Sequence, residues 1–236
     1  AVVRAAVLYA LRVLIGTPIP LNEGCLEHVT IEVPPGSILA PPATAAVVGG
    51  NVETSQRLVD LFLAAAGVRA ASAGTMANLT LGGGGAAPWD PAWSLYETIG
   101  GGLGATATAH GIGGRQTHMT NTRATDVEVL EVRLPLRVRG FSLRPGTGGL
   151  GRWRGGDGLV REIEVLTETT ATLLAAWRKN GANGQAGGGP GAPGWAETQR
   201  EGTWARWDGN AIALVAGDRV RVHTPGGGGW SAEETS

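Results

Sequence analysis

The segment at residues 116–123 gathers side chains that could do chemistry. Its eight residues, QTHMTNTR, include an imidazole, hydroxyl groups, an amide and a guanidinium, a higher density of hydrogen-bonding groups than an ordinary loop needs. In an extended chain alternate side chains share a face, so His118 would lie with Thr120 and Thr122, opposite Asn121 and Arg123. A solvated strand end, or a turn capped by Asn121, explains the segment equally well.

A second polar cluster, at residues 51–57, is expected at the start of a helix. Asn51 is a good N-cap, Glu53 suits the positive end of the helix dipole, and Gly67 ends the helix after about Ala66. One apolar stripe is expected to face the core, made of Leu58, Leu61, Phe62 and Ala65. Because backbone N–H groups point out of a helix start, this cluster suits an anion or a carbonyl oxygen.

Other patterns that could indicate a site are weaker. The GLGATA string at 102–107 loosely matches a dinucleotide-binding loop, but more glycines follow too soon for a crossover helix. No phosphate-binding GxxxxGK[ST] loop and no GxSxG elbow occur, although Ser, His and Asp residues for a triad are present. Cys25 is interpreted as a small apolar residue in a turn. Glu97 is either a further candidate for the functional site or a structural carboxylate at the end of a strand.

The first half of the chain is expected to be mixed in secondary structure. Residues 2–15 are apolar nearly all round and are followed by Gly16 and Pro18, which predicts a helix buried inside the fold. Residues 28–33 alternate between apolar and polar side chains before a Pro-Pro-Gly turn, which predicts a half-buried strand.

From Val127 the pattern favours strands. Alternation over 132–143, with a change of phase at Gly140, predicts a strand with a bulge, and further strands are expected at 159–166, 170–177 and 218–223. Residues 180–194 form a Gly/Pro-rich loop. The sequence therefore predicts an α+β protein with an α/β segment at 1–126, carrying both polar motifs and buried helices, and a β-rich segment at 127–236.

The composition excludes several classes of function. The chain has 236 residues, 42% of them hydrophobic, and a formal net charge of −1 with no run of basic residues, so neither nucleic acid nor a membrane surface is an expected partner. The single cysteine excludes an internal disulfide and a Cys-rich zinc site. It fits a reducing compartment, and we expect a cytoplasmic protein.

Two further features suggest a fragment of a larger subunit. The chain does not begin with Met, and its apolar periodicity is already present at the first residues. We expect such a fragment to expose apolar surface. The 40 glycines far exceed the usual ~7%, and their short clusters are interpreted as tight turns.

Seven strings, in order along the chain, carry a resemblance to a known family. They are PLNEGC at 20–25, GNVETSQR at 50–57, GTMAN at 74–78, YETIGG at 96–101, THMTNTR at 117–123, RWRGGDG at 152–158 and TPGGGG at 224–229. They span essentially the whole chain, and NVETSQR, HMTNTR and RGGDG are the specific ones. On these strings the chain resembles the hydantoinase B/5-oxoprolinase family, as the C-terminal part of a B-type subunit or domain. It departs from the family pattern in the loop at 181–184.

The resemblance implies part of an ATP-dependent hydrolase that opens small cyclic amides such as 5-oxoproline or N-methylhydantoin. ATP would act through a hydantoinase A-like subunit or domain in a hetero-oligomer, and the isolated fragment would be inactive. This chain would hold no cofactor or metal itself, because the His/Asp segment associated with a divalent metal in carboxylase relatives belongs to the N-terminal half of the subunit. The alternatives are an acetone or acetophenone carboxylase-like subunit and a non-catalytic structural or interface module.

Within that resemblance the two polar segments supply the expected site. Glu53 and His118 are the candidate catalytic bases, and the candidate substrate-binding residues are Asn51, Thr54, Ser55, Arg57, Thr120, Asn121 and Arg123. If both segments serve one reaction, the fold must bring them together. Glu53→Gln and His118→Ala would then each reduce turnover while leaving the melting temperature nearly unchanged.

Overall fold

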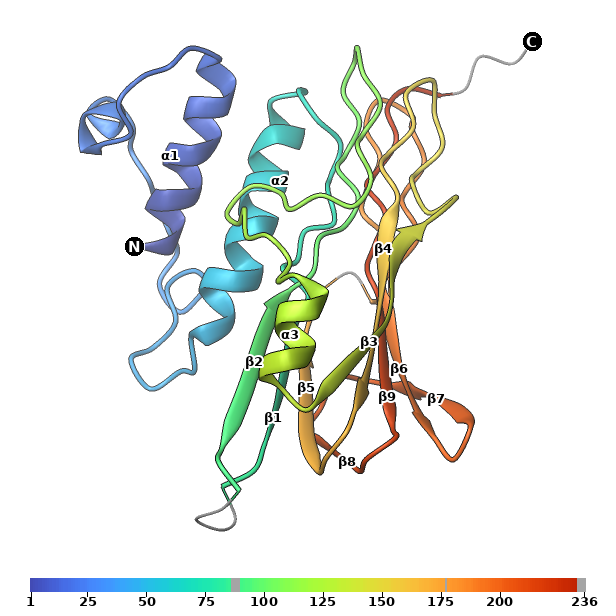
Figure 1. Cartoon of the computed structure of the whole chain (residues 1–236). Coiled ribbons are helices and arrows are strands. Elements are labelled where there is room, and N and C mark those ends of the chain that lie inside the picture. Colours follow the sequence, from blue (N-terminus) through green and yellow to red (C-terminus); the bar gives the residue numbers. More distant parts are fainter. Residues whose placement is uncertain (86–89, 177, 233–236) are drawn as a thin grey trace.

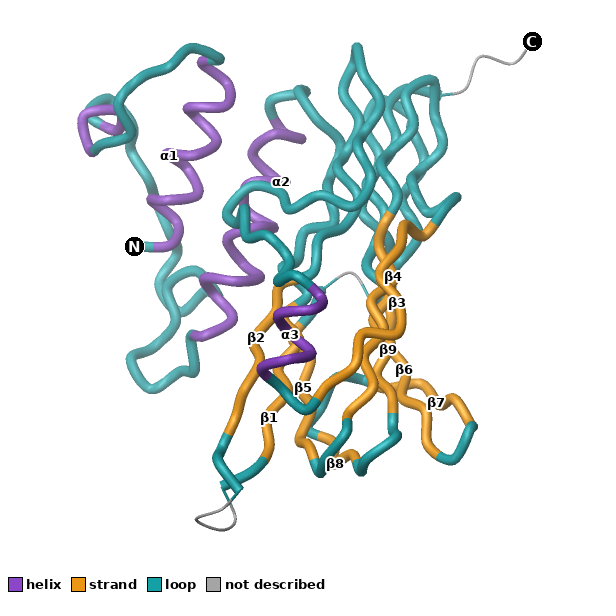
Figure 2. The backbone as a smooth tube through the Cα atoms, viewed as in Figure 1, coloured by secondary structure: helices purple, strands orange, loops and turns teal. Residues whose placement is uncertain are grey.

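A computed structural model of the chain describes residues 1–85, 90–176 and 178–232. Two helices lie on one side of a sandwich of two antiparallel sheets, and long segments without regular secondary structure extend beyond one end of it (Figures 1 and 2). The helical elements are α1 (Val2–Ile15), η1 (Glu23–Leu26), η2 (Gly50–Thr54), α2 (Ser55–Ala65) and α3 (Val127–Arg133). The strands are β1 (Asn78–Gly83), β2 (Trp93–Thr98), β3 (Leu136–Arg144), β4 (Gly158–Val165), β5 (Thr169–Leu174), β6 (Trp195–Arg200), β7 (Thr203–Trp207), β8 (Ile212–Leu214) and β9 (Arg219–His223). This is the α+β class predicted from the sequence.

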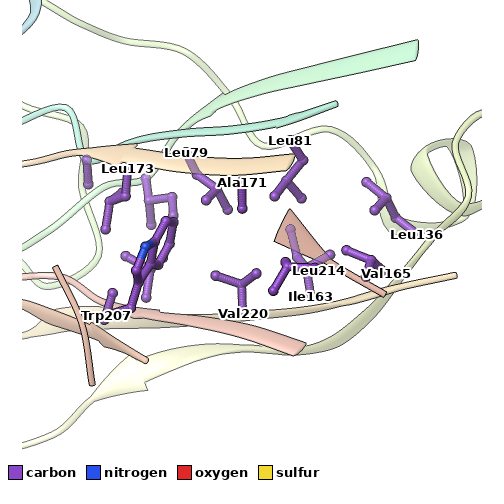
Figure 3. Packing of buried hydrophobic residues seen from close by; sticks show 14 of the residues in the cluster. Leu79, Leu81, Leu136, Ile163, Val165, Ala171, Leu173, Trp207, Leu214 and Val220 are labelled. Carbon is purple, nitrogen blue, oxygen red and sulfur yellow. The ribbon is translucent and has the colours of Figure 1, made fainter. Parts of the chain in front are cut away.

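The core lies between the two sheets. One sheet has the strand order β2-β1-β5-β8 and the other β3-β4-β9-β6-β7. Leu79, Leu81 and Leu173 of the first sheet face Ile163 and Val220 of the second, and all five are buried (Figure 3). The four-stranded sheet takes two strands from each side of residue 126, so the division of the chain at that residue stays a prediction.

Several predicted strands are confirmed. The bulge expected at Gly140 occurs as a shift of register between Val138 and Gly140 in the pairing of β3 with β4. β4 and β9 match the predicted ranges to within one residue, and β5 ends at Leu174. Trp177, the predicted end of that strand, lies outside the described residues.

Other predictions of secondary structure were wrong. Residues 127–133 form α3, because Asp126 caps it by accepting hydrogen bonds from the N–H groups of Glu128 and Val129. Residues 28–33 form no strand, since His28 lies in a turn and residues 29–33 have no regular secondary structure. The pattern also missed β1 and β2 and the strands β6 to β8. Their pairing is long-range, and local alternation alone does not reveal it.

The helix α1 is not inside the fold as predicted. It packs against α2 at the periphery and buries only Ala6 and Ala10, whereas Leu14 and Ile15 are exposed. An all-apolar helix was expected to be surrounded, but in the described part of the chain its C-terminal residues Val13, Leu14 and Ile15 are exposed.

The glycine clusters mostly do not mark tight turns. Segments from four parts of the chain, residues 102–104, 148–156, 188–191 and 226–229, form a glycine-rich bundle, in which they lie side by side (Figure 2). They exchange backbone hydrogen bonds, such as Gly156 N–H to Leu103 O and Gly227 N–H to Gly156 O, both 2.9 Å. A Cβ added at Gly104 would lie 1.9 Å from Ala70 O. The backbones therefore approach too closely for a side chain at this position, as at the axis of collagen, where only glycine fits.

Glu97 is a structural carboxylate. It is buried between the sheets, where Arg161 Nε donates to Oε2 at 3.0 Å and Nη2 donates to Oε1 at 3.1 Å. The pair links β2 to β4 across the sandwich, and the carboxylate has no free face for a substrate. Of its two interpretations, the structure supports the strand-end carboxylate.

Candidate functional site

The candidate site is built on a buried polar face of α2 and the turn before it. The helix begins with the π-helical turn η2, so Asn51 lies inside this turn and does not cap it as predicted. The predicted apolar stripe was confirmed at Leu58, which is buried, and at Phe62, which packs against its cluster, but was wrong at Leu61 and Ala65, which are exposed. The helix instead buries Gln56 and Asp60 against the segment 70–78 and the loop 117–119, on the side that also carries Glu53.

Glu53 occupies the start of this polar face. Its Oε1 accepts hydrogen bonds from Thr75 Oγ1 at 2.9 Å, Asn78 Nδ2 at 3.0 Å and the Met76 N–H at 3.2 Å. Its Oε2 is buried without a hydrogen-bond partner among the described residues. Burial raises the pKa of Glu53 to about 7, although the donors from Thr75, Met76 and Asn78 act in the opposite direction. A carboxyl group that titrates near neutral pH suits general acid–base chemistry.

Two further polar residues lie between Glu53 and a surface pocket. Asn78 donates to Glu53, and its Oδ1 accepts a hydrogen bond from the Tyr96 hydroxyl. Burial, and secondarily the charge of Glu53, raise the pKa of Tyr96, so this hydroxyl keeps its proton at neutral pH. Asn78, Tyr96 and Val52 line a pocket of about 440 Å³, whose other wall includes Leu174 and Asn210. A small ring compound could occupy this volume.

His118 occupies the other end of the polar face. Its Nε2 lies 2.8 Å from Asp60 Oδ1, which also accepts a hydrogen bond from the Ser72 N–H at 2.8 Å. The Tyr9 ring of α1 meets the imidazole edge-on at 5.9 Å between centroids. The side chain is only 4% exposed and the backbone has φ +53°, in the left-handed region. This imidazole is held by the protein on several sides.

The two polar segments predicted from the sequence do come together. The Met119 N–H donates to Gln56 Oε1 at 3.2 Å, and Gln56 lies one helical turn beyond Glu53. His118 and Glu53, however, bind different partners at opposite ends of this face, Asp60 for one and Thr75 with Asn78 for the other.

The remaining candidate residues differ in their accessibility. Ser55 is buried, and its hydroxyl donates to Asn51 O at 2.6 Å within the helix, so it is not available to a ligand. Arg57 is half-buried, and desolvation lowers its pKa. Thr54 and Thr120 are also half-buried, whereas Asn51, Asn121 and Arg123 are exposed. Their roles as substrate-binding residues stay predictions.

Sequence reasoning missed Thr75, Asn78, Tyr96 and Asp60. Thr75, Asn78 and Tyr96 lie in strings that carried the family resemblance, but nothing in the local pattern indicated that they would meet Glu53. Asp60 was hidden because its polar side chain occupies a buried position of the helix, where an apolar residue is the usual choice.

A stability prediction follows for His118. Replacing it with alanine removes one of the two hydrogen-bond partners of the buried Asp60 and leaves the Ser72 N–H as the other, so we expect the free energy of unfolding to fall by about 2–4 kcal/mol. The structure therefore changes the outcome expected from the sequence, which was an unchanged melting temperature. Thermal or urea unfolding measures the effect, and His28→Ala, at an exposed histidine, is the control. Equal stability of His118→Ala and wild type would contradict this account.

Within the described ranges 1–85, 90–176 and 178–232, no cluster of three or more His, Cys, Asp or Glu side chains could hold a metal ion. In the same ranges, no helix has both the length and the apolar character needed to cross a membrane.

Comparison with known proteins places this geometry in a family. The model of the family described as Hydantoinase B/oxoprolinase matches residues 1–233. The chain belongs to the hydantoinase B/oxoprolinase family. A relative in this family, 5-oxoprolinase 1 of Arabidopsis thaliana, is 45% identical over 234 residues, which are 98% of this chain and 18% of the relative. The chain thus spans about a fifth of the length of that relative.

Two solved structures share the fold of this family member. An ATP-dependent caprolactamase from Pseudomonas jessenii matches 97% of the chain with a TM-score of 0.76 and 22% identity, and the match covers 42% of that protein. An acetone carboxylase in its nucleotide-free form matches 69% of the chain with a TM-score of 0.59 and 20% identity, over 26% of that protein. At these identities the likeness establishes the fold alone.

Proposed function

We propose that this chain supplies part of the active site of a larger ATP-dependent hydrolase that opens small cyclic amides, with Glu53 as the general base. The observation that carries the proposal is the Glu53 carboxyl group, whose pKa is raised to about 7 beside a pocket lined by Asn78 and Tyr96. The names of the relatives, 5-oxoprolinase and caprolactamase, support a cyclic amide as the substrate class.

The proposed chemistry assigns a role to each group. Water adds to the amide carbon and its proton passes to the Glu53 carboxylate, whose Oε2 has no other partner among the described residues. The Tyr96 hydroxyl, which lines the pocket and donates to Asn78 Oδ1, can turn to donate to the oxygen that becomes negatively charged, whereas Asn78 keeps its two N–H groups on Glu53 and Leu174 O. The ring C–N bond then breaks, and the nitrogen takes up a proton to leave as an amine. His118 holds Asp60 and the loop 117–119 in place, which makes it a positioning residue.

ATP would be used through a hydantoinase A-like subunit or domain, because the sequence of this chain contains no phosphate-binding loop. ATP would supply activation of the amide carbonyl. A hetero-oligomer and a cytoplasmic location, both expected from the sequence, belong to the same proposal.

The proposal is tested by assaying the complete enzyme, the chain with its larger protein and partner. We expect ATP-dependent release of the ring-opened product from 5-oxoproline, N-methylhydantoin or caprolactam. Incorporation of bicarbonate into acetone or acetophenone, without ring opening, would instead support the carboxylase alternative. The 45% identity to 5-oxoprolinase 1 over 98% of the chain favours the hydrolase. Absence of both activities would favour the interface module.

A further inference from the structure

A second polar pocket lies on the outer face of the five-stranded sheet, beside the β6–β7 hairpin. It has a volume of about 500 Å³, and its lining includes Arg178, Trp195, Arg206 and Asp208. These residues come from the segment after β5, from β6 and from β7 with the turn that follows it. A pocket of this size suits a small molecule, and its strongest charges are two guanidinium groups.

The guanidinium of Arg206 is placed on an aromatic support. It lies 3.6 Å from the centroid of the Trp195 ring, and the His223 ring stacks on the same indole at 3.5 Å between centroids. The two groups cannot share one face at these distances, so the indole is sandwiched between them. Burial lowers the pKa of His223 to about 4, which leaves this imidazole neutral at pH 7. Stacking fixes the Arg206 plane and leaves its N–H groups available.

The guanidinium of Arg178 is held by backbone carbonyl groups. It donates to Asp208 O at 2.6 Å and to Trp207 O, which anchors it to the end of β7. Arg144 adds positive charge nearby, where its Nη1 donates to Pro193 O at 2.8 Å. Desolvation and, to a lesser extent, the charge of Arg206 lower the pKa of Arg144. Desolvation also lowers the pKa of Arg178, where the charge of Asp208 acts in the opposite direction and that of Arg206 in the same direction. Arg206 thus lies close enough to repel both Arg144 and Arg178.

The acidic groups around this pocket have other partners. Asp208 accepts hydrogen bonds from the backbone N–H and the side-chain amide of Asn210, at 2.9 and 2.8 Å. Glu197 is directly opposite Arg206 in the pairing of β6 with β7, yet it forms its ion pair with Arg221 at 2.9 Å. In the described part of the chain, no carboxylate forms an ion pair with Arg144, Arg178 or Arg206.

We propose that this pocket binds a small oxyanion, a carboxylate or a phosphate group, between the guanidinium groups of Arg178 and Arg206. Converging like charges are costly unless an anion neutralises them, and the planar guanidinium fork matches both carboxylate and phosphate. The inference does not depend on the cyclic-amide chemistry proposed above.

Hydrogen–deuterium exchange of the complete enzyme tests the proposal. Sodium phosphate and 5-oxoproline are added one at a time, with sodium chloride at matched ionic strength as the reference. We expect slower exchange in peptides covering residues 195–207 with at least one of the two probes. Protection by phosphate alone identifies a phosphoryl ligand, and protection by 5-oxoproline alone identifies a carboxylate.

Variants make the test specific. Arg206→Gln should raise the anion concentration for half-maximal protection roughly ten- to a hundredfold, because a charge-assisted hydrogen bond is lost. Arg206 is exposed, so this variant should fold, and Arg178→Gln provides a second test. Arg137→Gln is the control, because Arg137 lies on β3 at the opposite edge of the same sheet and is exposed. The Glu53→Gln enzyme should still show protection, which separates this site from the proposed reaction. No protection by either probe, or equal protection in Arg206→Gln, would overturn the proposal.

Discussion

Glu53→Gln in the complete enzyme is expected to lower kcat for ring opening by about 10²–10⁴-fold, the usual contribution of a general base. The amide oxygen of glutamine can still accept hydrogen bonds from Thr75 and Asn78. The pocket therefore keeps its shape, while the group that accepts the proton is lost. We expect KM to change little, because the carboxyl group is needed for the proton transfer and not for ground-state binding. Steady-state kinetics with ATP and the preferred cyclic amide measures both constants.

The pH dependence gives this prediction a second readout. The base must be ionised, and the pKa of Glu53 is about 7, so kcat/KM should fall as the pH drops below about 7. Stability has the opposite dependence. The ordinary pKa of a glutamate is 4.5, and burial in the folded state raises that of Glu53 to about 7. The stabilising contribution of the protonated carboxyl group is therefore complete below pH 4.5 and is lost as the pH rises through 7. Glu53→Gln should remove this loss and be at least as stable as wild type at pH 8.

The control for this variant is Glu128→Gln, at an exposed carboxylate in the first turn of α3. It should leave kcat and its pH profile unchanged. Wild-type kcat in Glu53→Gln would exclude Glu53 as the base and favour the interface module. A loss of folded protein in the same variant would instead assign Glu53 a structural role.

The second large effect is expected at Gly104, in the glycine-rich bundle. A methyl group there would lie 1.9 Å from Ala70 O and 2.8 Å from Ala71 O, and both contacts are with backbone atoms that cannot rotate away. Gly104 also donates its N–H to Ser72 Oγ at 3.1 Å, next to the Asp60 and His118 pair. Gly104→Ala should therefore lower the free energy of unfolding by more than about 3 kcal/mol, at or beyond the upper end for overpacking.

Gly189→Ala is the matched control within the same bundle. The nearest atom to an added methyl group there is Leu150 O at 3.4 Å, an ordinary contact. Chemical denaturation of both variants and wild type measures the difference. If Gly104→Ala unfolds at the same denaturant concentration as Gly189→Ala, the bundle tolerates separation of its segments, and close backbone contact is not what requires glycine there.

The sequence by itself determined the family, the α+β class and much of the β-rich half. Specific strings such as NVETSQR and HMTNTR identify relatives without any three-dimensional information, and the bulge at Gly140 was visible as a change of phase along a single strand. The sequence also indicated Glu53 and His118 as the titratable groups of interest. These features are local, since each depends on residue types and spacing within one short segment.

Only the tertiary structure decided what each of those groups touches. Glu53 and Asp60 lie on the same polar face, where Glu53 contacts Thr75 and Asn78 and Asp60 contacts His118. Glu53 therefore has a pKa near 7 beside a pocket, whereas Asp60 belongs to a buried pair. The structural role of glycines such as Gly104 was also decided by the tertiary structure, because the close backbone contact involves two segments far apart in sequence. Burial and partners set pKa values and packing, and both arise from long-range contacts that no single segment encodes.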